Sequence, residues 1–252
     1  MKLVLHPGHS KCGSTTIQRT IIKNRSLLES HGYIIPDPQL RTNGDEGFNP
    51  NGETPRPFFR YAMEQGDLSN LKMKLDAIKR KYKDDNKIIL ISAENLVNQL
   101  GQSAGLNIHR LLRDYFIDCQ VIYYIRRQDQ FIMSAWQQWG YKQGLALNAF
   151  IKRAVSMRSP NYRLITSAFS NIYGKTNVQV VPLAKDSLHG GDLITDFFYR
   201  LGVTDRVRLP VRSVDNKSLN PYICEALAQV SHIFRSYCQI LCMAGQAAVL
   251  SD

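Results

Sequence analysis

The first residues of the chain place two glycines, a lysine and a run of hydroxyl side chains at spacings that suit an anion-binding loop. Four residues separate Gly8 from Gly13, and residues 14–16 all carry hydroxyl groups. The apolar run at 3–5 predicts a buried strand before the loop, and the residues after the loop predict a helix. A glycine-containing loop in this position presents backbone N–H groups and the positive end of a helix to an anion. The segment therefore predicts a cradle for a phosphate or sulfate group.

The position of the lysine indicates which kind of cradle this is. The P-loop of nucleotide triphosphatases reads G-x-x-x-x-G-K-[ST], with lysine directly after the second glycine. Here Ser14 occupies that position, whereas Lys11 lies inside the loop. The displaced lysine argues against ATP hydrolysis but keeps a cation beside the bound anion. The alternatives are an ordinary loop lysine, and hydroxyl groups at Ser14, Thr15 and Thr16 that cap the helix as well as, or instead of, binding the anion.

Continuous apolar runs alternate with amphipathic segments along the chain. The runs that predict strands are 3–5, 87–92, 121–125 and 178–181, with a brief extended piece at 33–36. The segments that predict helices are 14–30, 68–83, 104–116, 130–143, 147–155, 162–173, 193–201 and a last one from 220. This order is typical of an α/β, three-layer fold with a central, mainly parallel sheet flanked by helices, similar to the P-loop NTPase fold. We expect a single domain over residues 1–252, with a loop insertion at about 37–57 that is either a lid or substrate-binding segment or a disordered insertion.

Polar side chains follow the predicted strands at the point where each strand ends. Glu94 comes soon after the strand at 87–92, and Arg126 directly follows the one at 121–125. Ligands of open α/β sheets bind at the carboxyl ends of the strands, so both residues are candidate site residues. A carboxylate there can accept a proton from a hydroxyl group, which makes Glu94 a candidate general base and His9, within the loop, its rival. The alternative roles are an ion pair or helix cap for Glu94 and a structural ion pair for Arg126.

Two segments resemble the family of PAPS-dependent sulfotransferases, where PAPS is 3′-phosphoadenosine 5′-phosphosulfate. The first is Lys11-Cys12-Gly13-Ser14-Thr15-Thr16, which is similar to the 5′-phosphosulfate loop of that family. The second is Arg126 with Ser134 eight residues later, which is similar to the pair that holds the 3′-phosphate. The wider resemblance is to bacterial members and covers residues 1–36 and 87–143. PAPS carries anionic groups at two ends, so two separate cradles suit it.

The resemblance implies transfer of a sulfuryl group from PAPS to an acceptor hydroxyl or amine on a carbohydrate or small metabolite, with PAP as the other product. It implies that Lys11 stabilises the departing 3′,5′-diphosphate, that Glu94 accepts the acceptor's proton, and that no metal takes part. Residues 11–16, Arg126 and Ser134 would then bind the nucleotide. Two other functions remain open, a P-loop nucleotide kinase and a basic nucleotide- or glycan-binding module without catalysis.

The composition predicts the kinds of partner and compartment. Lysine and arginine number 32 against 21 acidic residues, a net charge of +11 that favours anionic partners. These cations are spread along the chain, so we expect no nucleic acid polymer as partner. Five scattered cysteines predict reduced thiols in a cytoplasmic protein, and the lack of a long apolar run predicts no membrane span. The aromatic residues Trp136, Trp139 and Tyr141 are interpreted as core, with the lining of an acceptor or adenine site as the alternative. Lys217 lies in a basic loop at 206–217 that is a weaker candidate for nucleotide contact.

Overall fold

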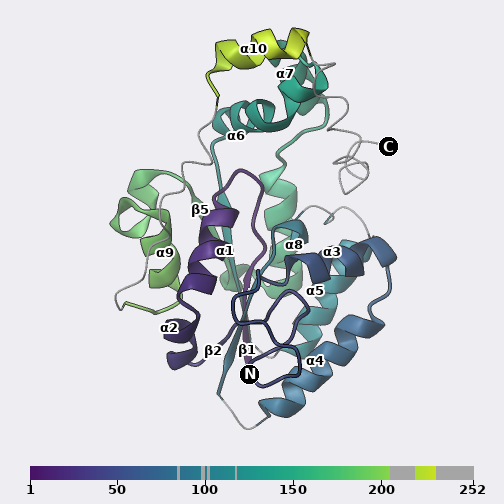
Figure 1. The fold of residues 1–252 in the computed structure, drawn as a ribbon, viewed down its shortest axis with the longest axis vertical. Helices are drawn as coiled ribbons and strands as arrows, with labels where there is room; N and C mark the ends of the chain where they lie inside the picture. The colour runs from purple at the N-terminus through teal and green to yellow at the C-terminus, as the bar shows by residue number, and fades with distance from the viewer. Residues whose placement is uncertain (84–85, 98–99, 101–102, 117, 205–218, 231–252) are drawn as a thin grey trace. The chain divides into compact units, whose positions relative to one another are not determined.

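The computed structural model describes residues 1–83, 86–97, 100, 103–116, 118–204 and 219–230, and these contain a five-stranded parallel β-sheet (Figure 1). In order across the sheet, the strands are β2 (Tyr33–Ile34), β3 (Ile88–Ser92), β1 (Lys2–His6), β4 (Asp118–Ile125) and β5 (Val178–Pro182). Every pair of neighbouring strands is parallel. The predicted strands are therefore confirmed, and the brief extended piece at 33–36 supplies an edge strand.

The chain, for which the sequence predicts one domain, divides into two compact units. The first unit comprises Met1–Ile125 and Tyr162–Val211, and the second comprises Arg126–Asn161 and Arg212–Asp252. All five strands of the sheet belong to the first unit.

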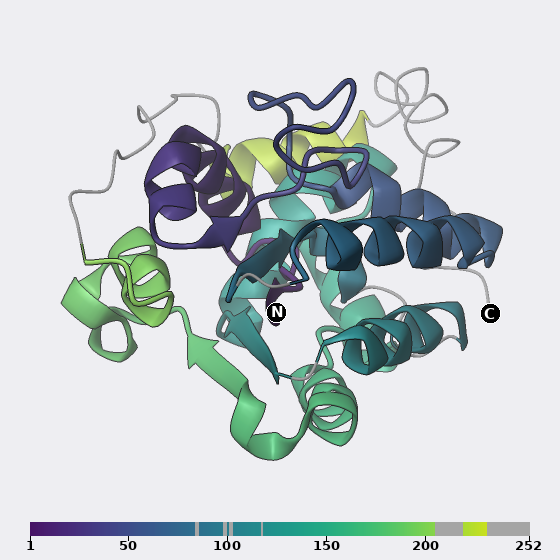
Figure 2. The same ribbon diagram turned by 90° about the horizontal axis from the view of Figure 1, so that it is seen from below.

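Helices cover both faces of the sheet in the first unit. One face packs against α1 (Ser14–Lys23), α2 (Arg25–Ser30) and α9 (Leu193–Arg200). The other packs against α3 (Arg56–Gln65), α4 (Ser69–Lys81), α5 (Ser103–Tyr115) and α8 (Tyr162–Tyr173). Successive strand residues point to opposite faces, so Val4 joins the first core while Leu3 and Leu5 join the second. Figure 2 shows the two helical layers on opposite sides of the sheet. The three-layer α/β fold is thus confirmed.

The crossovers that leave β1 and β3 run over opposite faces of the sheet. The chain passes from β1 to β2 through α1 and α2 on one face, and from β3 to β4 through α5 on the other. Because β1 and β3 are neighbours, the strand order reverses between them. The loops that follow β1 and β3 therefore occupy the position at which open α/β sheets bind ligands.

The second unit is a small helical cluster. It contains α6 (Gln128–Ala135), the π-helical turn η2 (Trp136–Gly140), η3 (Tyr141–Gln143), α7 (Leu147–Ser156) and α10 (Pro221–Gln229). Trp136 and Tyr141 are buried in its core, as the packing interpretation predicts, whereas Trp139 is only half-buried. Trp136 Nε1 donates a hydrogen bond to the Leu145 carbonyl at 2.8 Å. Gly140 lets Phe150 pack closely, because a Cβ atom at Gly140 would lie 2.7 Å from Phe150 Cδ2.

Three features of the elements differ from the sequence-based expectation. The helix predicted over 14–30 breaks at Asn24, whose side chain donates to the Thr20 carbonyl at 2.8 Å and competes with the backbone ladder. Helix α3 has no counterpart in the prediction, and the helix predicted over 130–143 includes the π-turn. The basic loop at 206–217, with Lys217, lies outside the described residues. The remaining short turns are η1 (Glu94–Leu96), η4 (Lys175–Asn177), η5 (Lys185–Ser187) and η6 (His189–Gly191).

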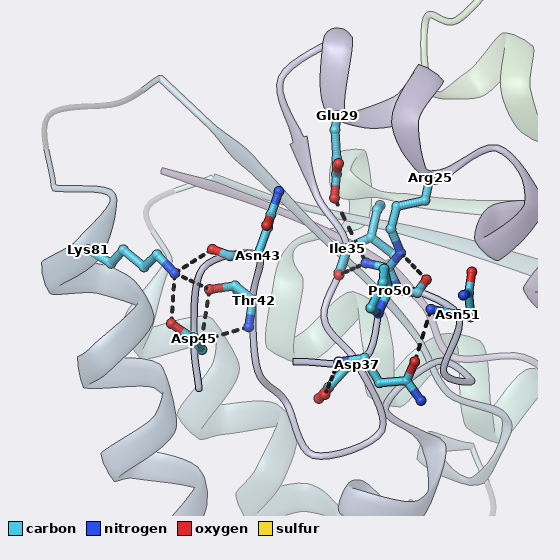
Figure 3. A network of polar contacts seen from close by, with 11 residues as sticks. Arg25, Glu29, Ile35, Asp37, Thr42, Asn43, Asp45, Pro50, Asn51 and Lys81 are labelled. Carbon is cyan, nitrogen blue, oxygen red and sulfur yellow. Dashed lines mark hydrogen bonds and ion pairs between the residues drawn. The ribbon is translucent and has the colours of Figure 1, made fainter. Parts of the chain in front are cut away.

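The insertion at 37–57 is fixed to the fold by buried polar contacts, which are drawn in Figure 3. Asp37, 1% exposed, accepts hydrogen bonds from the backbone N–H groups of three loop residues, Gln39, Arg41 and Asn49. Arg25 on α2 donates to the carbonyls of Ile35 and Pro50. In the structure the segment therefore forms a defined loop that is anchored by these contacts.

Candidate functional site

Residues 7–13, called here the cradle loop, connect β1 to α1. Three of them adopt the left-handed backbone region, with φ of 59° at Gly8, 63° at Lys11 and 80° at Gly13. The Cys12 N–H donates to the His9 carbonyl at 3.1 Å and closes a turn in which Lys11 takes the third position. A lysine in this backbone region costs about 1–2 kcal/mol. The loop therefore holds Lys11 in a conformation that its own backbone preference does not favour.

The start of α1 carries no side-chain cap. Gly13 is the N-cap residue, and among the described residues no side-chain cap hydrogen bond is made at this helix start. The expectation that Ser14, Thr15 and Thr16 also cap the helix is therefore wrong: Ser14 is already the first helical residue and points its hydroxyl elsewhere. Within the described residues, the N-terminal amides and the positive end of α1 consequently lack a capping side chain.

The start of α9, in the same unit, is capped by a side chain, unlike the start of α1. α9 begins after Asp192, whose carboxylate accepts hydrogen bonds from the N–H groups of Ile194 and Thr195 at 3.0 and 2.9 Å. That end is already neutralised by a side chain. The Cys12 N–H is used in the turn with His9, so the amides that suit an anion are those that follow it, at residues 13–16.

Glu94 lies directly against the cradle loop. It follows β3, is half-buried, and accepts a hydrogen bond from the Ser14 hydroxyl at 3.1 Å to Oε2. Gly8 makes this approach possible, because a Cβ atom there would lie 3.1 Å from Glu94 Cα and 3.1 Å from Ser14 Cβ. The structure thus brings together the loop and the carboxylate, each of which the sequence analysis placed at the end of a strand.

A buried pair ties the carboxyl ends of β1 and β3. His6 and Ser92 are opposite each other in the strand register, and His6 Nδ1 lies 2.8 Å from Ser92 Oγ. Burial lowers the pKa of His6 to about 3, so its ring is neutral at ordinary pH. Sequence reasoning did not find the role of Ser92. The available signal was that both residues end neighbouring apolar runs.

His9, the rival base, is almost enclosed in the loop. Its Nδ1 lies 3.1 Å from the Ser10 carbonyl, and because a carbonyl only accepts, Nδ1 carries the hydrogen. Burial is the main cause that lowers the pKa of His9, which favours the neutral ring. The ring centroid lies 5.3 Å from that of Tyr162 and 6.2 Å from that of Tyr123. A neutral imidazole can accept a proton, so His9 keeps the chemistry required of a base.

Buried side chains lie in and beside the cradle loop. Cys12 is 1% exposed, so its thiol faces the interior rather than solvent. The Tyr123 hydroxyl is buried and has no hydrogen-bond partner among the described residues, and burial raises the pKa of this phenol. At Gly13 an added Cβ would collide with the Leu193 side chain, so the start of α9 packs against the loop.

The other two predicted nucleotide ligands lie in the second unit. Arg126 directly follows Ile125, the last residue of β4, and is half-buried, and Ser134 is 9% exposed within α6. Arg127 is exposed and pairs with Asp129, with 2.7 Å between Nε and Oδ1. The predicted ligands thus fall into one group around the cradle loop, in the first unit, and a second group in the second unit.

Comparison with known proteins adds no assignment. No family model matches the chain, and no curated protein matches its sequence. Within the described residues, no three or more His, Cys, Asp and Glu side chains gather as a metal site. The helices described there are all too short or too polar to cross a membrane.

Proposed function

We propose that the chain is a sulfotransferase that moves a sulfuryl group from PAPS to an acceptor hydroxyl or amine. The observation that carries the proposal is the contact between Ser14 and Glu94 at the uncapped start of α1, beside the loop that bears Lys11. This arrangement combines an anion cradle, a cation and a carboxylate base. Group transfer from an anionic donor to a hydroxyl requires all three.

The residues have distinct roles in the proposed reaction. The amides at 13–16 orient the anionic oxygens of the donor, which supplies the sulfuryl group. Glu94 accepts the proton of the acceptor hydroxyl while the acceptor oxygen forms the new bond to sulfur. The bond between sulfur and the bridging phosphate oxygen breaks, and Lys11 stabilises the negative charge left on that oxygen. Arg126 and Ser134 are proposed to hold the 3′-phosphate, by the resemblance alone.

The acceptor is proposed to be a carbohydrate or a small metabolite. The net charge of +11 supports an anionic or strongly polar acceptor, because positive potential concentrates such molecules near the protein.

One observation favours a second candidate, a nucleotide kinase. In P-loop enzymes a hydroxyl of the loop and an acidic residue of a neighbouring strand together hold Mg²⁺, and the Ser14–Glu94 contact has that form. Against it, Ser14 stands at the lysine position of the P-loop pattern. We prefer sulfuryl transfer because the lysine of this chain, Lys11, lies inside the loop, as in the sulfotransferase pattern, and not directly after the second glycine.

Titration calorimetry with three nucleotides separates the two candidates. We expect 3′,5′-ADP to bind more tightly than 5′-ADP, and ATP with Mg²⁺ to bind more weakly than 3′,5′-ADP. A 3′-phosphate that adds nothing, together with tight Mg²⁺-dependent binding of ATP, would overturn the sulfotransferase assignment in favour of the kinase. Binding of 3′,5′-ADP without any sulfuryl transfer across acceptor classes would indicate a binding module.

Variants of the cradle loop and its carboxylate test the mechanism. Lys11→Ala should abolish turnover, and Glu94→Gln should lower kcat by about 10²–10⁴-fold while 3′,5′-ADP binding survives, as expected for loss of a general base. His9→Asn is the matched variant of the rival base and should retain more activity. Full activity in Glu94→Gln with loss in His9→Asn would transfer the role to His9.

A further inference from the structure

The second unit buries little apolar surface for its size. Within the described residues, the buried side chains of its core are Trp136, Tyr141, Cys224 and Ala228, with partly buried neighbours packed around them. The stability of a helical cluster depends mainly on the apolar area that it removes from water. A cluster with so small a core therefore needs further apolar contacts to be stable.

Helix α7 carries an apolar stripe that the described residues cover only in part. Leu147 and Phe150 pack against the core of the unit, whereas Ile151 and Val155 are exposed, Val155 by 67%. Leu147, Ile151 and Val155 follow one another at intervals of four residues, so they lie in one row along the helix. Only the first residue of this row meets the core. We call Ile151 and Val155 the apolar face of α7.

Helix α10 brings the chain that follows it close to this face. The Leu147 N–H, at the start of α7, donates to Glu225 Oε2 on α10 at 3.1 Å. Val230, at which α10 ends, is five residues beyond Glu225, or about 8 Å along the helix axis. Ile223 and Val230 are also exposed, so uncovered apolar side chains continue to the end of this helix. Residue 231 therefore begins a short distance from α7.

The sequence from 231 to 252, which lies outside the described residues, is typical of a segment that is covered rather than solvated. Of these 22 residues 13 are apolar, and Arg235 and Asp252 are the only ones among Lys, Arg, Asp and Glu. A solvated tail is instead rich in charge and poor in aliphatic and aromatic side chains. Apolar residues also recur at the spacing of one helix face, which predicts an amphipathic helix. They are Ile233, Tyr237, Ile240, Leu241 and Ala244.

We propose that the segment 231–252 folds back over the second unit and covers the apolar face of α7. A helix over 231–244 would span about 21 Å, which exceeds the length of about 15 Å of the ten-residue α7. The segment is tethered to α10, so its effective concentration at α7 is about millimolar, well above that of a second copy of the chain in dilute solution. This proposal does not rest on sulfuryl transfer.

Hydrogen exchange, followed by mass spectrometry, tests the proposal on the whole chain. Amides at 233–244 should exchange at least about tenfold more slowly than in an unfolded peptide of that sequence, because the contact with α7 stabilises the closed state. Val155→Glu places a charge in the contact and should restore most of the unprotected rate there. Amides of β4, in the first unit, show whether the variant has unfolded more widely. If they also exchange faster, the milder Val155→Thr should still raise the rate at 233–244 without that effect.

A matched control distinguishes the apolar face from the rest of α7. Ser156→Glu makes the same charge change at an exposed position away from the stripe, and it should leave exchange at 233–244 within about twofold. Equal effects of Val155→Glu and Ser156→Glu would overturn the proposal, as would unprotected exchange at 233–244 in the unmodified chain. Protection that disappears on dilution would assign the cover to a second copy instead. Protection that requires phosphatidylcholine vesicles would assign it to a lipid surface, and this too would overturn the proposal.

Discussion

At the scale of single residues, Gly8 is the position on which the geometry of the candidate site depends. It has a left-handed φ of 59°, and its missing Cβ leaves room for both Glu94 and Ser14 at 3.1 Å. Gly8→Ala should therefore cost about 1 kcal/mol for the backbone conformation and more for crowding. It should also separate Ser14 from Glu94 and weaken 3′,5′-ADP binding.

Gly32 provides the matched control for this substitution. Its φ is +83°, and nothing lies within 4 Å of an added Cβ atom. Gly32→Ala isolates the conformational cost and should leave nucleotide binding unchanged. Urea denaturation and calorimetry measure the two effects, and equal losses of stability with equal nucleotide affinity would contradict the role given to Gly8.

At the scale of elements, the insertion at 37–57 depends on one buried cation. Arg25 is 5% exposed, donates to the Ile35 and Pro50 carbonyls, and lies 5.2 Å from the ring centroid of Phe48. Arg25→Ala removes these contacts and leaves the carbonyl of the buried Ile35 without this donor. We expect it to lower the free energy of unfolding by about 2–4 kcal/mol and to expose the loop to proteases.

A surface arginine shows what the loss of an ordinary ion pair would do. Arg60 on α3 pairs with Glu64 one turn later at 2.7 Å, and both side chains are largely exposed. Arg60→Ala should cost no more than about 0.5 kcal/mol. Chemical denaturation of the two variants compares them directly, and similar small losses would mean that Arg25 does not fix the insertion.

At the scale of the whole molecule, the sheet could be predicted because its strands are covered on both faces. Burial on both faces makes the runs at 3–5, 88–92 and 121–125 continuous in apolar residues, a pattern that survives in the sequence. The break at Asn24 and the π-turn after Ala135 depend on local hydrogen bonds and close packing instead. Periodicity alone carries no information on either of these.

The candidate site, like the fold, could be predicted only in part from the sequence. The rule that ligands meet the carboxyl ends of parallel strands places Glu94 at the same sheet edge as the cradle loop, and the adjacency of β1 and β3 in the structure brings the two into contact. The sequence did not predict the His6–Ser92 pair or the packing of Leu193 against Gly13, because these contacts join segments that are far apart in the sequence. The capping role of residues 14–16 failed because Gly13, in the left-handed region, takes the N-cap position.

The stability of the first unit should depend on pH through its buried histidines. Burial lowers the pKa of His6 to about 3 and that of His109 to about 4, from the ordinary 6.5. Below pH 6.5 the unfolded chain therefore binds protons that the folded chain does not, so unfolding becomes easier as pH falls. Each histidine should lower the free energy of unfolding by about 1.4 kcal/mol per pH unit until its folded pKa is reached.

Urea denaturation between pH 4.5 and 6.5 measures this slope, because the ordinary aspartate pKa of 3.8 and the ordinary glutamate pKa of about 4.3 lie below that window. His109 is the sharper position: its Nε2 lies 2.8 Å from the Leu96 carbonyl and its Nδ1 lies 2.8 Å from the Tyr173 hydroxyl. His109→Gln can keep both contacts without titrating, so it should lose one histidine's share of the slope. A free energy of unfolding that stays constant across this window would contradict the neutral, buried state of both rings.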